Sequence, residues 1–207
     1  MTRIKICGIT NVEDATWVAN LSADYLGLVF AKESKRKVNL ENAQEIARVV
    51  PPYIQKVGLF VNQEPDLVNK ILELYKLELL QFHGEETPQY CQQFKGKAKI
   101  IKAFRIKDEE SLSQISQYDV DFYLLDAFIE GEQGGTGENF NWDLALKVKE
   151  FGRPIFLAGG LKPDNVVEAI KKVEPFAVDV SSGVEASPRR KSVELMQEFI
   201  NKVRKIK

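Results

Sequence analysis

The stretch PIFLAGGLKPDNVVEAIKKVEPFAVDVSSG, residues 154–183, holds one complete strand–helix–strand unit. Short apolar runs at Pro154–Leu157 and Ala177–Val180 have the length and composition of buried strands. Between them, Lys162–Val173 has helical apolar spacing, with Pro163 suited to the first turn. Because strands joined through a helix run parallel with a right-handed crossover, the stretch predicts a parallel α/β fold.

The same kind of unit recurs along the whole chain. Eight predicted strands lie at Arg3–Ile6, Tyr25–Phe30, Lys56–Val61, Leu79–Phe82, Lys99–Phe104, Phe122–Phe128, Pro154–Leu157 and Ala177–Val180. Eight predicted helices lie at Asn11–Leu21, Leu40–Val50, Asp66–Lys76, Thr87–Phe94, Glu110–Gln117, Trp142–Phe151, Lys162–Val173 and Lys191–Lys205.

Both a closed (β/α)8 barrel and an open doubly wound sheet use this alternation. Eight units in 207 residues leave about 26 residues each, close to the minimum for such a crossover. The count of eight favours the closed form, and no linker or change in composition marks a second domain. We therefore expect an α/β protein, a single-domain TIM barrel over residues 1–207.

Composition excludes several classes of function. The chain has 29 basic and 30 acidic residues and a formal charge of -1, unlike a typical nucleic-acid-binding protein or a polybasic membrane anchor. It has no run of about 20 apolar residues and no secretion-signal core, and its two cysteines are too few for a disulfide scaffold. We expect a cytoplasmic protein without nucleic-acid or membrane partners.

Side-chain alternation on the strands predicts a buried ion pair. Inward and outward residues alternate in a barrel, so Ile4 and Ile6 face helices while Lys5 points inward. Asp179 points inward from the eighth strand, which adjoins the first in a closed barrel. Since an unpaired buried charge is unfavourable, we expect Lys5 to pair with Asp179 beneath the site. The alternative is that Lys5 extends to one end of the barrel.

Four polar residues fall at the carboxyl ends of predicted strands: Cys7, His83, Asp126 and Ser181. Each alone has an ordinary structural explanation, such as core filling for a cysteine or loop capping for an aspartate. Barrels of this type keep their chemistry at the carboxyl ends of the strands, and four polar residues on that rim indicate an active site.

Three glycine-rich loops are candidate ligand contacts. Gly159 and Gly160 follow the seventh strand, and the run Ser181, Ser182 and Gly183 follows the eighth, where barrels frequently bind phosphate. A longer connection, residues 129–141, contains Gly135 within the run GGTG and has the length of a functional loop. For the loops at 159–160 and 181–183, the alternative is that both are ordinary tight turns.

A basic loop follows the second strand, with the sequence KESKRK at residues 32–37. Such a cluster is usually a solvated surface loop. At this rim, however, Arg36 could hold a planar carboxylate through two parallel hydrogen bonds. The predicted site would then bind two anionic groups, phosphate at one end and carboxylate at the other.

Several motifs together resemble the phosphoribosylanthranilate isomerase family of tryptophan biosynthesis. They are KICGIT at 5–10, QFHGE at 81–85, LLD at 124–126, GGTG at 134–137 with FNW at 140–142, LAGGL at 157–161 and VDVSSGVE at 178–185. The resemblance covers the whole chain, and its first and last motifs are highly specific together.

The resemblance implies a (β/α)8 barrel without metal or organic cofactor. Such an enzyme converts N-(5′-phosphoribosyl)anthranilate into its 1-deoxyribulose isomer by an Amadori rearrangement, with a small phosphorylated substrate as partner. Position by position, it implies Cys7 as general base and Asp126 as general acid. Arg36 would hold the anthranilate carboxylate. The remaining implied substrate contacts are His83, Gly135, Gly159, Gly160, Ser181, Ser182 and Gly183. The family includes monomers and homodimers.

The proposed acid and base each need a particular environment. An ordinary thiol supplies only a few per cent thiolate near neutral pH, and Lys5, on the face of Cys7, is a candidate to stabilise that form. An ordinary aspartate is ionised at neutral pH, so Asp126 needs burial or a negative neighbour to retain a proton.

The sequence departs from the family pattern outside the acid and base. Lys35 stands where a proline is common, Arg189 where a glycine is usual and Ser192 where an aspartate is common, so loop geometry is open to question. The alternatives are a related barrel acting on another phosphorylated aminoaldose and a non-catalytic phosphate-ligand binder. Related barrels use lysine and glutamate or two aspartates, and Cys7 fits neither.

Overall fold

The computed structural model describes residues 1–106, 108–126 and 142–206, and its central element is a closed barrel of eight parallel strands. The strands are β1 (Arg3–Cys7), β2 (Tyr25–Val29), β3 (Gln55–Phe60), β4 (Leu79–Phe82), β5 (Lys99–Arg105), β6 (Phe122–Asp126), β7 (Ile155–Ala158) and β8 (Ala177–Val180). Each strand pairs with its neighbours in sequence, and β8 pairs with β1. The predicted closed barrel is confirmed.

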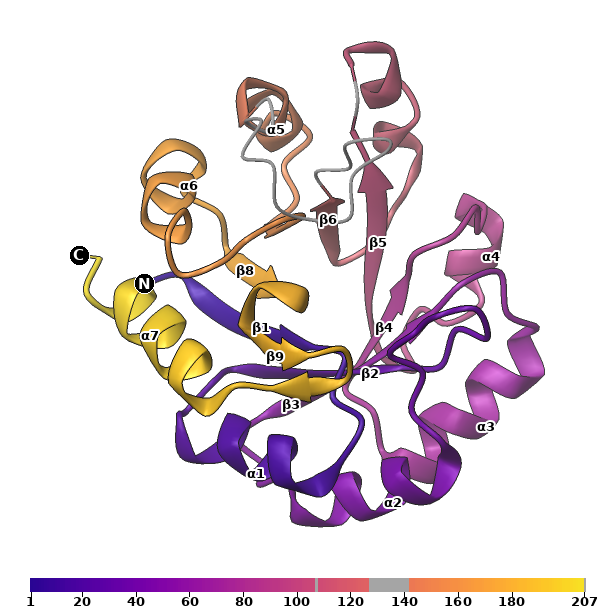
Figure 1. Ribbon diagram of the computed structural model, residues 1–207. Coiled ribbons are helices and arrows are strands. Elements are labelled where there is room, and N and C mark those ends of the chain that lie inside the picture. Colours follow the sequence, from indigo (N-terminus) through magenta and orange to yellow (C-terminus); the bar gives the residue numbers. More distant parts are fainter. Residues whose placement is uncertain (107, 127–141, 207) are drawn as a thin grey trace.

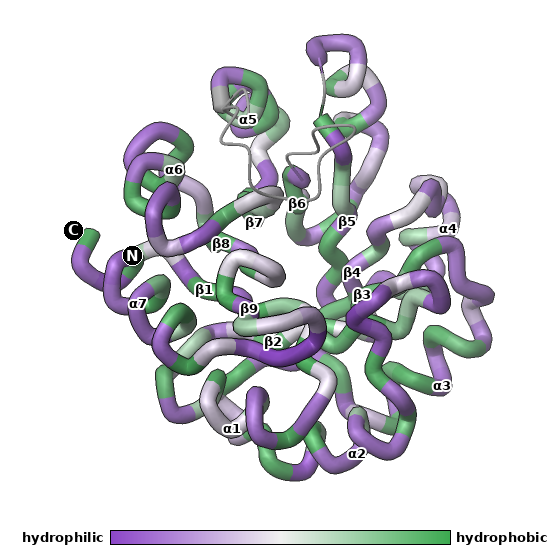
Figure 2. The backbone as a smooth tube through the Cα atoms, in the orientation of Figure 1, coloured by the Kyte–Doolittle hydropathy of each residue, from purple (hydrophilic) through white to green (hydrophobic). Residues whose placement is uncertain are grey.

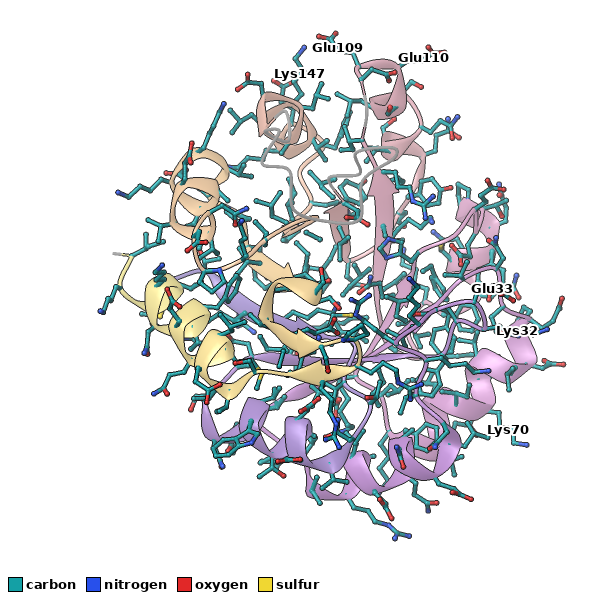
Figure 3. All side chains as sticks on the ribbon, viewed as in Figure 1. Lys32, Glu33, Lys70, Glu109, Glu110 and Lys147 are labelled. Atoms are coloured by element: carbon teal, nitrogen blue, oxygen red, sulfur yellow. The ribbon has the colours of Figure 1, made fainter. Side chains whose placement is uncertain are left out.

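Helices surround the barrel and cover its outer face (Figure 1). They are α1 (Val12–Asn20), α2 (Leu40–Val49), α3 (Pro65–Tyr75), α4 (Pro88–Gln92), α5 (Trp142–Lys149), α6 (Val166–Val173) and α7 (Val193–Arg204). Charged side chains such as Lys70, Glu109 and Lys147 point away from the barrel into solvent (Figure 3). In the described part of the chain, none of the helices has the length and apolar character to cross a membrane.

The predicted helix at Glu110–Gln117 is wrong. Two short 3-10 helices stand there instead, η1 (Glu110–Leu112) and η2 (Ile115–Gln117). The buried side chains of this segment, Leu112 and Ile115, are three residues apart, which suits the three-residue turn of a 3-10 helix. Ser113 also bonds the carbonyl of Glu110 through its hydroxyl, and such local bonds compete with a regular helix.

Two other predicted helices begin later than expected. Pro163 lies in a turn before α6, where the side chain of Asn165 accepts from the Lys162 amide and donates to the Gly160 carbonyl. Lys191 belongs to strand β10, and α7 starts after Ser192, whose hydroxyl caps the Leu195 amide. The Ser192 hydroxyl thus caps the first turn of α7, whereas the Asn165 bonds hold the loop before α6 and do not cap that helix.

Apolar side chains form one layer between strands and helices and a second inside the barrel. Figure 2 shows apolar residues concentrated along strands and on the strand-facing sides of helices. Ile4 and Ile6 belong to the outer layer, whereas Tyr25, Leu124 and Phe156 pack together inside the barrel. The alternation predicted from the sequence is therefore confirmed on the first strand.

The seam between β1 and β8 closes the barrel through an ion pair. Lys5 and Asp179 are register partners across this seam, and Nζ of Lys5 donates to Oδ2 of Asp179 at 2.7 Å. The Lys5 side chain is wholly buried. The predicted pair is confirmed, and extension of Lys5 to a barrel end is excluded.

A small hairpin follows the eighth strand and explains two departures from the family pattern. The 3-10 helix η3 (Ser182–Val184) leads into β9 (Glu185–Ser187) and β10 (Arg190–Lys191), which pair antiparallel. Arg189 occupies the turn with φ +72°, a left-handed conformation that favours glycine. Ser192 caps α7 as an aspartate would. The hairpin therefore forms without the usual residues.

Candidate active site

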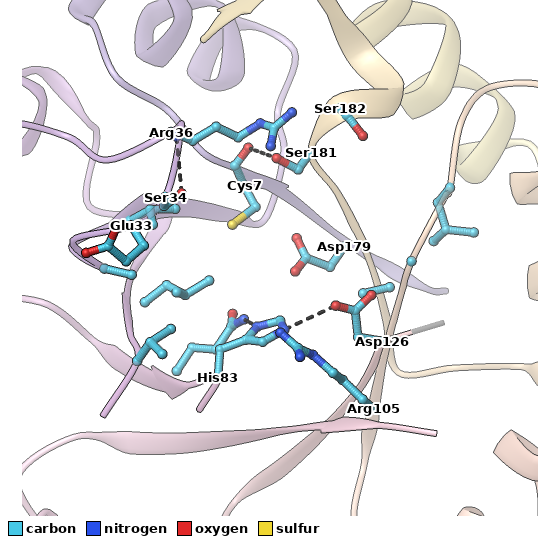
Figure 4. Close-up of a pocket in the computed structure, with 18 of the residues that line it drawn as sticks. Cys7, Glu33, Ser34, Arg36, His83, Arg105, Asp126, Asp179, Ser181 and Ser182 are labelled. Carbon is cyan, nitrogen blue, oxygen red and sulfur yellow. Dashed lines mark hydrogen bonds and ion pairs between the residues drawn. The ribbon is translucent and has the colours of Figure 1, made fainter. Parts of the chain in front are cut away.

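A cavity of about 630 Å³ opens at the carboxyl ends of the strands. Its walls include residues from β1, β3, β4, β5, β6 and β8 and from loops after β2, β7 and β8. Figure 4 shows Cys7, Arg36, His83, Asp126, Asp179 and Ser181 around this space. Side chains from segments more than 170 residues apart thus share one cavity.

Cys7 is the last residue of β1, and its sulfur is turned into the cavity (Figure 4). The neighbouring strand provides room for it, because a Cβ at Gly27 would lie 2.8 Å from the sulfur. Burial raises the pKa of the thiol above its ordinary value, although the Lys5 charge acts in the opposite direction. The expected stabilising effect of Lys5 on the thiolate exists but does not overcome burial.

Asp126 ends β6 and takes part in a hydrogen-bonded chain of three side chains. Nε2 of Gln81 lies 2.9 Å from Nδ1 of His83, and Nε2 of His83 lies 3.1 Å from Oδ2 of Asp126. The amide nitrogen can only donate, so Nδ1 accepts, and the ring hydrogen sits on Nε2 and points to the carboxylate. His83 thus orients Asp126, and its side-chain contacts in this structure are the Gln81 amide and the Asp126 carboxylate.

Arg36 extends from the loop after β2 and is already engaged with a carboxylate. Its Nε and Nη2 donate to the two carboxylate oxygens of Glu185, both at 2.7 Å. The hydrogen bonds that Arg36 donates to Glu185 raise the pKa of the guanidinium, which burial alone would lower. Arg36 lines the cavity at the same time.

The loops after β7 and β8 form a cradle of free amides. Gly159 and Gly160 have φ angles of +85° and +62°. Among the described residues, the amides of Gly159, Gly160, Ser182 and Gly183 donate no hydrogen bond. Free amides grouped in two adjacent loops suit a phosphate.

Gly183 is needed for the two loops to touch. A Cβ there would lie 1.9 Å from the carbonyl oxygen of Leu161, which is backbone and cannot move alone. Gly183 is not a wall residue of the cavity as described, whereas Ser181 and Ser182 are. Its place is between the loops, where it permits their contact.

Two buried acceptor atoms in the walls have no partner among the described residues: Oδ1 of Asp179 and Oε1 of Gln81. A buried acceptor without a donor is unfavourable, so a ligand that fills this cavity should bring donor groups to it. Hydroxyl groups are suitable donors, whereas an ionised phosphate or carboxylate is not.

Most of the predicted site residues come together in the structure. Eight line the cavity: Cys7, Arg36, His83, Asp126, Gly159, Gly160, Ser181 and Ser182. Gly135 lies outside the described residues. In the part of the chain that is described, no group of three or more histidine, cysteine or acidic residues is placed to hold a metal ion.

The residues that the sequence analysis did not assign to the site include Gln81 and Arg105 in the walls, and Glu185 and Lys191 behind Arg36. Alternation along β4 predicts that Gln81 shares the inward face of the strand with His83, but on its own it assigns Gln81 no role in the site. Glu185 lies within the family motif at 178–185. The position of Lys191 could not be inferred, because its segment was predicted to be helical.

Comparisons with known proteins agree with this geometry. The family described as N-(5'phosphoribosyl)anthranilate (PRA) isomerase matches residues 4–202. The N-(5'-phosphoribosyl)anthranilate isomerase of Citrifermentans bemidjiense is 50% identical over 206 residues, which are 100% of this chain and 98% of the relative.

Two solved structures are similar over nearly the whole chain. The phosphoribosylanthranilate isomerase of Thermotoga maritima has a TM-score of 0.92 and 38% identity, with 99% of each chain covered. A complex of such an isomerase with reduced 1-(o-carboxyphenylamino)-1-deoxyribulose 5-phosphate has a TM-score of 0.88 and 37% identity, again with 99% of each chain covered.

Proposed function

The chain belongs to the N-(5′-phosphoribosyl)anthranilate isomerase family, and from this premise we propose how its residues divide the work of the reaction. The protein is an aldose–ketose isomerase of tryptophan biosynthesis. It converts N-(5′-phosphoribosyl)anthranilate into 1-(2-carboxyphenylamino)-1-deoxyribulose 5-phosphate. The substrate is thus a small molecule with a phosphate at one end, a carboxylate at the other and a sugar between them.

The phosphate binds the cradle of amides at Gly159, Gly160, Ser182 and Gly183. This placement is supported by the free amides and by the positive φ angles of the two glycines after β7. The carboxylate binds Arg36, a cationic wall residue in the loop after β2 whose guanidinium can form two parallel hydrogen bonds.

The sugar lies between the two anionic ends, over Asp179 and Gln81. Both residues present a buried acceptor that lacks a donor among the described residues. The sugar hydroxyls are the donors that the substrate offers at this place. Bound hydroxyls would remove the unfavourable desolvation of these acceptors and so favour the substrate over a less hydroxylated anion.

Cys7 and Asp126 move the protons. Asp126 gives a proton to the ring oxygen as the furanose opens, and the nitrogen lone pair forms the imine. The Cys7 thiolate then removes the proton from C2′, leaving an enolamine that tautomerises to the ketone. The Nε2–H of His83 stabilises the carboxylate that Asp126 becomes after donation.

The observation that carries the proposal is that the Cys7 sulfur and the Asp126 carboxylate open onto one cavity beside an anion cradle. A base and an acid on different strands can act on opposite sides of one bound sugar. Membership of this isomerase family also supports a cytoplasmic protein that acts as a monomer or homodimer.

Replacing either proton carrier tests the proposal. We expect Cys7→Ala and Asp126→Asn each to lower kcat by about 100- to 10,000-fold, measured as loss of phosphoribosylanthranilate fluorescence. Binding of the reduced product analogue should change little, because neither side chain holds an anionic end of the ligand. The matched control is Cys91→Ala, which removes the other buried thiol. Turnover within about threefold of the unmodified protein in either variant would overturn the assignment.

A further inference from the structure

Behind Arg36 lies a cluster of three charges, Arg36, Glu185 and Lys191. Glu185 accepts two hydrogen bonds from Arg36 at 2.7 Å, and its Oε1 accepts a third from Nζ of Lys191 at 3.2 Å. The Lys191 side chain is wholly buried and that of Glu185 is 6% exposed, whereas that of Arg36 is 28% exposed. The cluster therefore meets solvent and ligand mainly through the guanidinium.

The charge balance of the cluster depends on Lys191. Arg36 and Glu185 alone would form a neutral pair, with little attraction left for another carboxylate. Lys191 adds one positive charge, so the three residues together carry a net charge of +1. A buried charge a few ångströms away acts strongly because screening by water is weak there.

The guanidinium has a second edge available for a ligand. Arginine carries five N–H donors, and Glu185 takes the edge formed by Nε and Nη2. Among the described residues, Nη1 has no hydrogen-bond partner. The Nη1 and Nη2 edge can thus hold another carboxylate while Glu185 keeps its own.

Lys191 lies in the hairpin after β8 and is held in place by hydrogen bonds to residues outside that hairpin. Its amide donates to Oδ2 of Asp14 in α1, and its Nζ also donates to the carbonyl of Ser181 at 2.9 Å. Burial lowers the pKa of Lys191, while the Glu185 charge opposes this change. Burial also disfavours ionised Glu185, but the Arg36 hydrogen bond and the Lys191 charge outweigh it and lower its pKa.

We propose that Glu185 and Lys191 are positioning residues that set the orientation and the net charge with which Arg36 meets the anthranilate carboxylate. Neither belongs to the described walls of the cavity, so both act through Arg36. The inference rests on the proposed function of Arg36 in binding the carboxylate. It adds that Lys191 supplies the net positive charge of the cluster.

The net charge of the cluster predicts how KM should change in each variant. Lys191→Met makes the cluster neutral and should raise KM about tenfold, with a smaller decrease in kcat because Lys191 also favours the Cys7 thiolate. The double variant Glu185→Gln/Lys191→Met returns the net charge to +1 and should bring KM back close to that of the unmodified protein. A residue needed only for packing would instead give a double variant at least as impaired as Lys191→Met.

Two inhibitors distinguish the carboxylate from the phosphate, because Lys191 also bonds the Ser181 carbonyl beside the phosphate loops. We expect Lys191→Met to weaken competitive inhibition by anthranilate about tenfold and to leave inhibition by inorganic phosphate within about twofold. An equal loss for both anions would overturn the inference. So would an unchanged KM in Lys191→Met, or a double variant without recovery.

Arg36→Met separates failure of this inference from failure of the proposed function. If Arg36→Met leaves KM unchanged, the carboxylate role itself is wrong. If it raises KM and Lys191→Met does not, only the positioning role is wrong. Lys202→Met, a change at a lysine on α7 paired with Glu198, is the matched control and should leave KM unchanged. Thermal unfolding of each variant checks that the fold is retained.

Discussion

The thiol of Cys7 illustrates how a single residue depends on its surroundings. Lys5 and Lys191 favour the thiolate, whereas burial and the Asp179 charge favour the protonated form. Burial is the largest of these effects, and the pKa of the thiol is raised. In the free enzyme the thiol, which is the base in our proposal, is therefore mostly protonated near neutral pH.

This pKa direction predicts a pH dependence. In our proposal the thiol must be deprotonated to accept the C2′ proton, and Asp126 must carry a proton in order to donate it. A rise in pH therefore affects the two residues in opposite senses, so the thiol is best followed in Asp126→Asn, which has no acid at this position. We expect the residual kcat/KM of Asp126→Asn to rise with pH by up to about tenfold per unit from about pH 6 to 9. The measurement is initial rate at low substrate across this range, with Asp126→Asn/Cys91→Ala as a control that should follow the same profile. A flat or falling profile would contradict Cys7 as the base.

At the scale of elements, the proposed phosphate cradle depends on contact between two loops rather than on one motif. The loop after β7 supplies glycines with positive φ, and the loop after β8 approaches it at Gly183. The β9–β10 hairpin then returns the chain to α7 and brings Glu185 and Lys191 behind Arg36. Both of the proposed anion-binding ends of the site therefore depend on the segment after β8.

Gly183→Ala should separate the two loops. The added methyl group would overlap the Leu161 carbonyl, so the loops must move apart, at about 2–3 kcal/mol in unfolding free energy. We also expect weaker inhibition by inorganic phosphate, because the amides no longer converge. Gly160→Ala is the comparison, since its Cβ would meet open space and only its positive φ opposes alanine. Equal phosphate affinity in Gly183→Ala and the unmodified protein would contradict the loop contact.

Arg189→Gly should be tolerated and slightly stabilising. A left-handed φ disfavours arginine, and relief of that strain outweighs the greater backbone entropy of glycine in the unfolded chain. We expect a gain of about 0.5 kcal/mol in unfolding free energy, measured by urea denaturation. Arg189→Val should instead lose about 1 kcal/mol or more, because a β-branched residue fits this conformation poorly. If valine were as stable as glycine, backbone strain at this turn would be negligible.

At the scale of the whole molecule, the seam between β1 and β8 closes the barrel and also contributes Asp179 to the cavity wall. Lys5 and Asp179 are 174 residues apart in the chain and lie opposite each other across this seam. The pair places two buried charged side chains below Cys7, at positions where apolar side chains are more usual. The Oδ1 atom of the same aspartate remains for a ligand.

Breaking this pair should destabilise the barrel strongly. Lys5→Met leaves Asp179 buried without its cation, and we expect a loss of about 3–5 kcal/mol in unfolding free energy by urea denaturation. Lys5→Met/Asp179→Leu removes both charges and should recover most of that loss. Lys95→Met breaks an exposed pair with Asp119 and should change stability by less than about 1 kcal/mol. A double variant no more stable than Lys5→Met would show that the two charges are not coupled.

Periodicity along the chain was enough to predict the barrel and part of its interior. Apolar runs separated by helical segments indicate parallel strands, and alternation along β1 and β8 predicts that Lys5 and Asp179 meet. Both inferences depend only on local geometry and on the closure of eight strands. The positions of Cys7, His83 and Asp126 at one rim follow from the same rule.

The burial, hydrogen-bond direction and available charge of each site residue could be determined only from the folded structure. Burial of the Cys7 thiol, the donor direction of His83 and the charge available at Arg36 depend on side chains from distant segments. Desolvation and hydrogen-bond direction are properties of a three-dimensional surrounding, so no spacing in one chain segment predicts them. The strand order and the rim residues follow from local patterns, whereas the protonation and charge of those residues follow from packing.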